Sequence, residues 1–324
     1  MVEKSRFETP PPLQPQPEDL GFDLDRILKS VVSLQAVIPE DAFTAPILGT
    51  ERAGSGVVIG ESGLVLTIGY LVAEAESVWL TSADGRVTPA HPLAYDQETG
   101  FGLVQALGRL DLPALELGKA AELKLGDPVV FAGGGRKQSV RARVVGKQEF
   151  AGYWEYLLDE AIFTAPAHPF WGGAGVVGPD GKLLGIGSLH VQQAAEGGQQ
   201  VDINMSVPID LLPPILDDLT KYGRVNKPPR PWLGIFSGES EGRIVVAHVD
   251  ERGPAAAAGL RQGDIISAIR DSSVDNLGDL YRQVWSCGPA GVEIPIEIVR
   301  DKRSLWLRVK SADRARYLKK PQLQ

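Results

Sequence analysis

Short apolar runs separated by turn sequences fill the chain from about residue 24 to residue 208. The turns include Asp84-Gly85, Gly133-Gly134-Gly135 and Pro179-Asp180-Gly181. Runs of this length, closed off by glycine, proline and aspartate, are typical of β-strands that follow one another at short spacing. The pattern therefore predicts a first domain that is mainly β and built of many short strands, over residues 23–222.

A different composition marks the two ends of this domain. Residues 1–22 are rich in Pro, Gln and Glu without periodicity, which predicts a flexible tail. Apolar residues recur at helical spacing from Ile209 to Leu219, and Pro213 with Pro214 is tolerated only in the first turn of such a helix. The proline-rich stretch within residues 223–231 then predicts a stiff linker.

Two motifs after the linker resemble those of a PDZ domain. They are Trp232-Leu233-Gly234-Ile235 and the longer Gly253-Pro254-Ala255-Ala256-Ala257-Ala258-Gly259-Leu260-Arg261-Gln262-Gly263-Asp264-Ile265-Ile266. The resemblance implies a small α/β domain over residues 232–315 and a C-terminal tail over residues 316–324. PDZ domains add a peptide as an extra strand and hold its terminal carboxylate with backbone N–H groups of a glycine-containing loop.

The resemblance also places the peptide-binding residues. The carboxylate-binding loop falls on Trp232, Leu233, Gly234 and Ile235. The helical wall of the groove falls on residues 277–285, where four apolar side chains recur at helical spacing. These side chains are Leu277, Leu280, Tyr281 and Val284. A groove residue and a core residue give the same pattern, so both interpretations of the four remain open.

Three segments of the first domain resemble the catalytic motifs of the HtrA (Do-like) family of bacterial trypsin-like proteases. They are Leu66-Thr67-Ile68-Gly69-Tyr70-Leu71-Val72, Asp96-Gln97-Glu98-Thr99-Gly100 and His168-Pro169-Phe170-Trp171-Gly172-Gly173-Ala174-Gly175. The family writes them roughly as L-T-N-x-H-V-V, D-x-x-T-D-L-A-L and N-P-G-N-S-G-G-P. Flanking runs such as Leu125-Gly126-Asp127-Pro128-Val129 fix the register. The resemblance implies two six-stranded antiparallel β-barrels, which agrees with the strand pattern.

The residues at the three catalytic positions of the family differ in this chain. The general base falls on Tyr70, the orienting aspartate on Gly100 and the nucleophilic serine on Gly172. A seryl hydroxyl attacks a carbonyl only when an imidazole takes its proton and a carboxylate holds that imidazole in the right tautomer. A phenol titrates near pH ~10, and glycine has no side chain to contribute. The alignment therefore predicts a chain without a catalytic triad.

The oxyanion hole of the family uses backbone N–H groups at positions that fall on Phe170 and Gly172. Glycine reaches backbone geometries that a residue with a side chain reaches less easily. We therefore expect Phe170 to have collapsed the hole, with Phe170 and Trp171 plugging the former cleft.

A replacement mechanism is the alternative. Of the four histidines, His168 and His190 fall near the former specificity pocket, where either could act as a base or as a metal ligand, with Ser188 as nucleophile. The sequence has no G-x-S-x-G elbow and no S-x-x-K pair to support a new serine mechanism. No cofactor is implied.

Composition narrows the choice of partners. The chain has 324 residues and a formal charge of -8, with no basic stripe apart from Lys319-Lys320, so nucleic acid is excluded as a partner. Cys287 is the single cysteine, which excludes an intramolecular disulfide and cysteine-based metal sites. No run of 18 or more apolar residues predicts a membrane span. The start of the chain lacks the apolar region of a signal peptide, so we expect a cytoplasmic protein, or a periplasmic one if a leader was removed.

Two functional hypotheses follow from these observations. The first is an inactive HtrA-like pseudoprotease, a scaffold or regulator in protein quality control that binds unfolded polypeptides or the C-termini of proteins. It would act as a homotrimer, for which Phe7 and Phe22 are the candidate aromatic contacts, or in a mixed assembly with an active family member. The second is a serine-type endopeptidase with a displaced mechanism, or a metal-binding variant of the fold. The cluster Tyr153-Trp154-Glu155-Tyr156 either lines a binding surface or packs inside a barrel.

Overall fold

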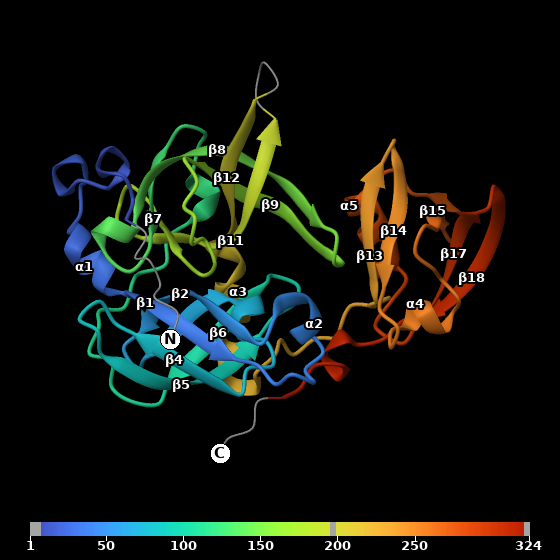
Figure 1. The fold of residues 1–324 in the computed structure, drawn as a ribbon, viewed down its shortest axis with the longest axis horizontal. Coiled ribbons are helices and arrows are strands. Elements are labelled where there is room, and N and C mark those ends of the chain that lie inside the picture. The colour runs from blue at the N-terminus through green and yellow to red at the C-terminus, as the bar shows by residue number, and fades with distance from the viewer. Residues whose placement is uncertain (1–7, 195–198, 321–324) are drawn as a thin grey trace. The chain divides into compact units, whose positions relative to one another are not determined.

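The computed structural model describes residues 8–194 and 199–320, which form two compact units (Figure 1). The first unit comprises the described residues up to Gln148, Glu160–Val225, and Lys319 with Lys320. The second unit comprises Glu149–Asp159 and Asn226–Leu318. The prediction of a mainly β chain with two barrels and an α/β domain is confirmed.

The first barrel is a closed antiparallel sheet in the order β1-β2-β3-β6-β5-β4. Its strands are β1 (Val31–Val37), β2 (Glu51–Gly60), β3 (Leu64–Ile68), β4 (Ser77–Thr81), β5 (Val87–Tyr95) and β6 (Phe101–Ala106). Burial alternates along β1 and β5, as expected for strands with one face on a core. The sheet closes because β1 pairs with both β2 and β4.

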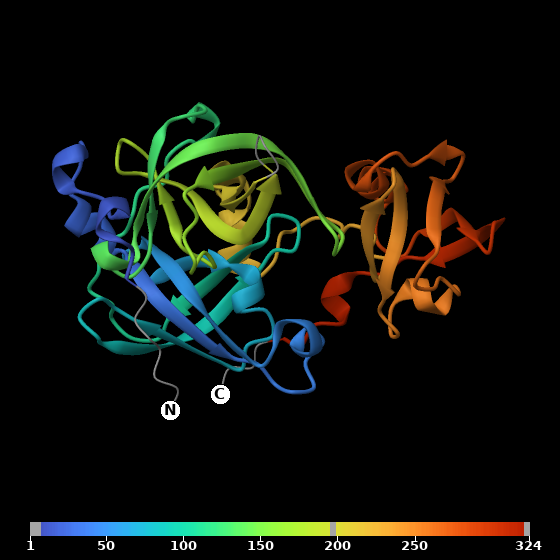
Figure 2. The same ribbon diagram turned by 45° about the horizontal axis from the view of Figure 1, so that its top comes forward.

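The second barrel has the order β10-β11-β12-β9-β8-β7 (Figure 2). Its strands are β7 (Pro128–Ala132), β8 (Val140–Gly152), β9 (Tyr156–Ala165), β10 (Gly175–Val177), β11 (Leu183–Ala194) and β12 (Gln200–Pro208). Pairing of β10 with both β7 and β11 closes this ring. The hairpin of β8 and β9 is longer than the barrel needs, and its tip belongs to the second unit.

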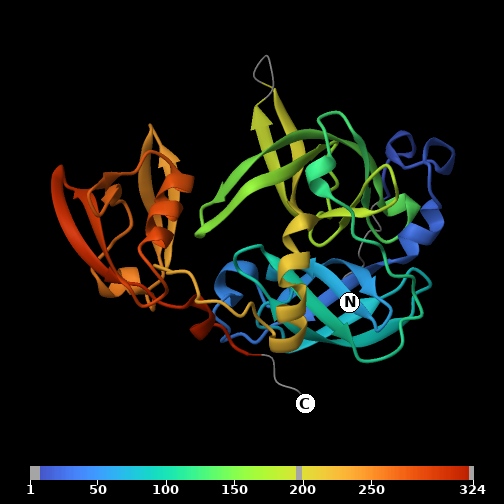
Figure 3. The same cartoon turned by 180° about the vertical axis from the view of Figure 1, so that it is seen from behind.

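Helices are short in the first unit. They are α1 (Leu24–Lys29), α2 (Ala45–Leu48) and α3 (Pro213–Tyr222), with 3-10 turns η1 (Pro11–Leu13), η2 (Pro17–Asp19), η3 (Gly69–Leu71), η4 (Ala120–Glu122), η5 (Arg136–Gln138) and η7 (Ile209–Leu211). The predicted helix after residue 208 is divided into η7 and α3, because the proline at Pro213 starts a new helix. Figure 3 shows α3 from behind, and Gly223 ends it in the left-handed conformation at φ 69.

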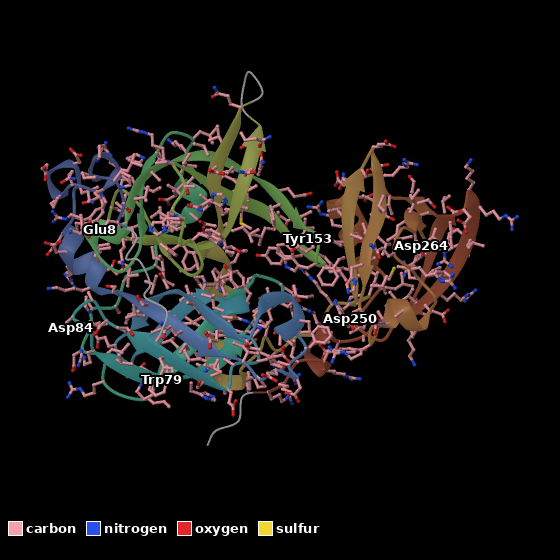
Figure 4. All side chains as sticks on the ribbon, viewed as in Figure 1. Glu8, Trp79, Asp84, Tyr153, Asp250 and Asp264 are labelled. Atoms are coloured by element: carbon pink, nitrogen blue, oxygen red, sulfur yellow. The ribbon has the colours of Figure 1, made fainter. Side chains whose placement is uncertain are left out.

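The second unit contains an open sheet in the order β13-β14-β15-β17-β18, with β16 paired to β15. Its elements are β13 (Ile235–Ser240), β14 (Arg243–Val249), α4 (Pro254–Ala257), β15 (Ile265–Ile269), β16 (Ser272–Ser273), α5 (Leu277–Ser286), β17 (Glu293–Arg300), β18 (Arg303–Lys310) and η8 (Arg314–Arg316). Asn276 caps α5 by accepting the N–H of Asp279 at 2.8 Å. The buried Asp264, labelled in Figure 4, is held by a forked contact from Arg300 at 2.6 and 2.7 Å.

The segments at the two ends of the chain differ from those expected. Residues 8–22, expected to be flexible, form η1 and η2, and the buried Thr9 donates its N–H to Lys137 O at 2.7 Å. Phe7 lies outside the described residues, and Phe22 packs against Gly181 of the same chain. The tail expected from residue 316 instead returns to the first unit at Lys319. These corrections share one reason, since each segment supplies backbone or charged groups that find partners on a folded unit. None of the described helices has the length and apolar character needed to cross a membrane.

A buried network holds the turn η3 in place. The carboxylate of Glu74 accepts the N–H groups of Phe43, Thr44 and Lys319 at 2.7–2.9 Å. It also accepts the hydroxyl of Thr44 at 2.6 Å, and Arg52 joins that hydroxyl to Tyr70 O with contacts of 2.7 Å each. Burial alone would raise the pKa of Glu74, but these hydrogen bonds outweigh it and lower the pKa.

Glu74→Gln is expected to lower the free energy of unfolding by about 1–3 kcal/mol, because an amide group would face N–H donors. Chemical denaturation at pH 7 measures the loss, with the exposed Glu61→Gln as the control. The loss should shrink as the pH falls through the lowered pKa of the native carboxylate, because the wild-type side chain then becomes protonated. An equal effect of both substitutions would contradict the network.

Candidate functional site

Tyr70 and Gly172, which the resemblance aligns with the general base and the nucleophile, lie next to each other in the structure. Tyr70 lies in η3, directly after β3, and its hydroxyl donates to Ser188 O at 2.9 Å. A Cβ atom on Gly172 would lie 2.9 Å from the same hydroxyl. Burial raises the pKa of Tyr70, against the smaller effect of a hydrogen bond with the side chain of Trp171. The phenol is therefore a protonated donor that fills the space of a side chain at residue 172.

Gly100 occupies the third position through its backbone alone. Its N–H donates to Asp96 O at 2.8 Å, and its carbonyl accepts the N–H of Gly69 at 2.7 Å. Its φ of +83 lies in the left-handed region, where a residue with a side chain is strained. Gly100 thus supports the turn that carries Tyr70 and offers no carboxylate.

His168 is a buried structural residue. Its Nδ1 accepts the N–H of Phe170 at 2.9 Å, which places the proton on Nε2, where the carbonyl of Gln138 accepts it at 2.5 Å. Asn204 brackets the backbone of His168 with contacts of 2.6 and 3.1 Å, and the ring stacks on Phe131. Burial lowers the pKa of the imidazole.

The contact between Phe170 and His168 also involves a backbone N–H group that the resemblance assigns to the oxyanion hole. The N–H of Phe170 points to an imidazole nitrogen, so this donor is not presented to a substrate oxygen. The side chain of Phe170 is 58% exposed, which corrects the expectation that it plugs the cleft. The ring of Trp171 lies 5.3 Å from that of His190, and its side chain forms a hydrogen bond with Tyr70.

The structure engages the candidate replacement residues in other contacts or buries them. Both ring nitrogens of His168 are engaged, and His190 Nε2 lies 3.5 Å from Asp202 Oδ1. Ser188 is buried, at 4% exposure, in a bulge of β11. Within residues 8–194 and 199–320, no group of three or more His, Cys, Asp or Glu residues is arranged to hold a metal ion.

The second unit contains a convergent set of N–H donors. Those of Leu233, Gly234 and Ile235 lie 2.9, 2.7 and 3.0 Å from the carboxylate oxygens of Glu155. Gly234 has a φ of +81, which lets neighbouring N–H groups turn toward one point. Trp232 does not take part in this set, because its N–H donates to Ala312 O and its ring packs on Tyr317.

The wall residues of the predicted groove are buried in the core of the second unit. Leu280, Tyr281 and Val284 are at most 1% exposed, and Leu277 is 8% exposed. Core packing therefore describes most of the set, while the hydroxyl of Tyr281 also reaches out to donate to Gly152 O at 2.7 Å. The sequence indicates Glu155 only as a member of an aromatic cluster. No local pattern predicts that its carboxylate accepts an N–H group 78 residues away.

Comparison with known families gives the class of protein. The family model described as a trypsin-like peptidase domain matches residues 54–186, and the one described as a PDZ domain matches residues 231–310. Fold and sites thus define a trypsin-like double barrel joined to a PDZ domain.

Relatives and solved structures share this combination. The chain is 28% identical over 265 residues to a probable periplasmic serine endoprotease DegP-like of Pseudomonas fluorescens, covering 78% of this chain and 54% of the relative. It is 26% identical over 294 residues to Protease Do-like 1, chloroplastic, of Arabidopsis thaliana, covering 81% and 64%. The chain thus spans about half to two thirds of the length of these relatives.

Two solved structures resemble the fold. The HtrA-type protease AlgW with decapeptide is 24% identical, with a TM-score of 0.53 over 92% of this chain and 98% of that one. The serine endoprotease from Yersinia pestis is 23% identical, with a TM-score of 0.53 over 89% and 95%. In its two domains and in its sequence, the chain is similar to Do-like (HtrA-type) serine proteases that carry a PDZ domain.

Gly172→Ala is expected to destabilise the chain by about 1–3 kcal/mol, because the new Cβ would meet the hydroxyl of Tyr70. The cost should be smaller in a Tyr70→Phe background, which removes that hydroxyl. Denaturant unfolding of the four proteins in this cycle measures the coupling. Gly21→Ala, at an exposed position with room for a Cβ, is the control, and an equal cost of Gly172→Ala in both backgrounds would refute the pairing.

Proposed function

We propose that this chain is a catalytically inactive member of the HtrA family that works as a peptide-binding scaffold or regulator. The observation that carries the proposal is the Tyr70–Gly172 pair, in which a protonated phenol fills the place of a nucleophile. Without the triad, an enzyme of this type keeps at most a residual rate of roughly 10³–10⁴ over water from binding and the oxyanion hole. The engaged N–H of Phe170 argues against even that contribution.

The binding activity falls to the PDZ domain. Its N–H groups at Leu233, Gly234 and Ile235 suit a carboxylate, and the edge strand β13 suits an added strand. We assign to it the C-termini of proteins and unfolded polypeptides as partners, consistent with the decapeptide in the AlgW structure. A periplasmic location follows the name of the relative from Pseudomonas fluorescens. A homotrimer, or an assembly with an active family member, belongs to the same proposal.

A serine endopeptidase is the second candidate, and the names of the relatives favour it. It would require a displaced nucleophile, for which Ser188 and His190 are the residues to test. The buried position of Ser188 and the pairing of its carbonyl with Tyr70 speak against it.

Purified protein is expected neither to degrade unfolded casein nor to react with a fluorophosphonate probe, with trypsin as the positive control. The combined substitution Tyr70→His, Gly100→Asp and Gly172→Ser should also fail, because Gly100 has a left-handed backbone and the N–H of Phe170 is engaged by His168. Cleavage that persists through purification and is lost in Ser188→Ala or His190→Ala would overturn the proposal.

A further inference from the structure

The tip of the β8–β9 hairpin occupies the carboxylate-binding loop of the PDZ domain. Glu155 is 6% exposed, and its two carboxylate oxygens accept all three N–H groups of the loop. Leu233 donates to one oxygen, while Gly234 and Ile235 donate to the other. A side-chain carboxylate thus makes the contacts that a terminal carboxylate makes with such a loop.

Two further contacts of the tip match those of a bound peptide. Tyr153, labelled at the tip in Figure 4, accepts the N–H of Ser237 on the edge strand β13 at 2.9 Å, as an added strand would (Figure 2). On the side of α5, the hydroxyl of Tyr281 donates to Gly152 O. The tip therefore contacts both walls of the groove.

An apolar side chain completes the likeness. Leu157, two residues after Glu155, is 8% exposed and belongs to the buried cluster that contains Leu233, Leu277 and Leu280. A peptide ligand combines a carboxylate, a strand backbone and an apolar side chain in the same way. Flanking ion pairs from Arg282 to Glu149 and Asp159 add exposed charge contacts.

The backbone at Glu155 indicates that its side chain is needed. Its φ of 60 lies in the left-handed region, which glycine and asparagine adopt more readily than glutamate. A turn selected for its geometry alone would favour one of those residues. The strained glutamate fits a position at which the carboxylate has a task.

We infer that Glu155 is an internal substitute for a peptide C-terminus, so that a peptide with a free terminal carboxylate and an apolar last residue binds only by displacing the hairpin tip. The inference rests on the proposed peptide-binding function. Both ligands need the same three N–H donors, so their binding is mutually exclusive. The apparent dissociation constant of a peptide then rises by the reciprocal of the fraction of chains with an undocked tip.

Docking of the hairpin tip carries a free-energy cost that favours its replacement by a ligand. Burial raises the pKa of Glu155 to about 7, against the opposing effects of the three N–H groups and of Arg314. Desolvation of the ionised side chain therefore costs more than its hydrogen bonds return. The apolar cluster and the Tyr281 contact hold the tip in place against that cost.

The full chain tests the inference with a fluorescein-labelled pool of decapeptides that are random except for a C-terminal Leu, chosen to match Leu157. Glu155→Ala is expected to bind the pool at least about tenfold more tightly than the wild type, and to lose this gain when the peptides are amidated. Glu160→Ala is the matched control, because Glu160 is an exposed carboxylate on the same hairpin that pairs with Lys147. Hydrogen exchange at Leu233, Gly234 and Ile235 should speed up in Glu155→Ala and slow again with peptide.

The outcomes separate the two proposals. Equal, carboxylate-dependent binding by wild type, Glu155→Ala and Glu160→Ala would overturn the internal substitute and leave the peptide-binding function standing. Absence of binding in all three, with exchange at the loop amides still faster in Glu155→Ala, would overturn the peptide-binding function and with it the displacement. If Glu155→Ala does not fold, Glu155→Gln keeps one acceptor oxygen and should show the same direction with a smaller gain.

Discussion

Backbone N–H and C=O groups that leave water need partners, and this requirement arranges both units of the chain. Each barrel satisfies it by closure, because β1 pairs with β2 and β4 while β10 pairs with β7 and β11. A closed sheet offers no edge to a peptide. The sheet of the second unit is open, and the loop before β13 contains N–H groups that converge on one point. The carboxylate of Glu155 in the same chain accepts these N–H groups, so the carboxylate-binding loop is occupied.

Polar groups in the region that aligns with the family's catalytic site also have hydrogen-bond partners within the chain. An active site keeps donors aimed at the place where charge develops in the transition state. Here the donor at Phe170 meets the imidazole of His168, and the hydroxyl of Tyr70 meets the carbonyl of Ser188. The groups therefore satisfy one another. In the proposed inactive chain, donors that an active site would present to a substrate are thus engaged within the protein.

Much of the fold and part of the candidate site could be predicted from the sequence. The features that could not be predicted were missed for physical reasons. Turn pairs and short apolar runs predicted many short strands, while the resemblance to known families implied the two barrels and the PDZ domain. Aligned motifs indicated Tyr70, Gly100 and Gly172, and the structure brings Tyr70 close to Gly172 and joins Gly100 to Gly69. Burial of Leu277 could not be separated from a groove position, because both need an apolar residue at the same helical spacing. The role of Glu155 depends on a contact 78 residues along the chain, which no local pattern encodes.

Competition for one set of donors turns the affinity of the PDZ domain into a difference between two free energies. The hairpin tip is covalently fixed to the chain, so its docking is intramolecular and its effective concentration does not depend on how much protein is present. The binding free energy of a free peptide must exceed the docking free energy of the tip. A ligand with a carboxylate but no apolar side chain to replace Leu157 does not meet this condition. The strands β8 and β9 continue from the tip into the second barrel. Binding of a chain end and docking of the hairpin tip are thus alternative states of one set of N–H donors.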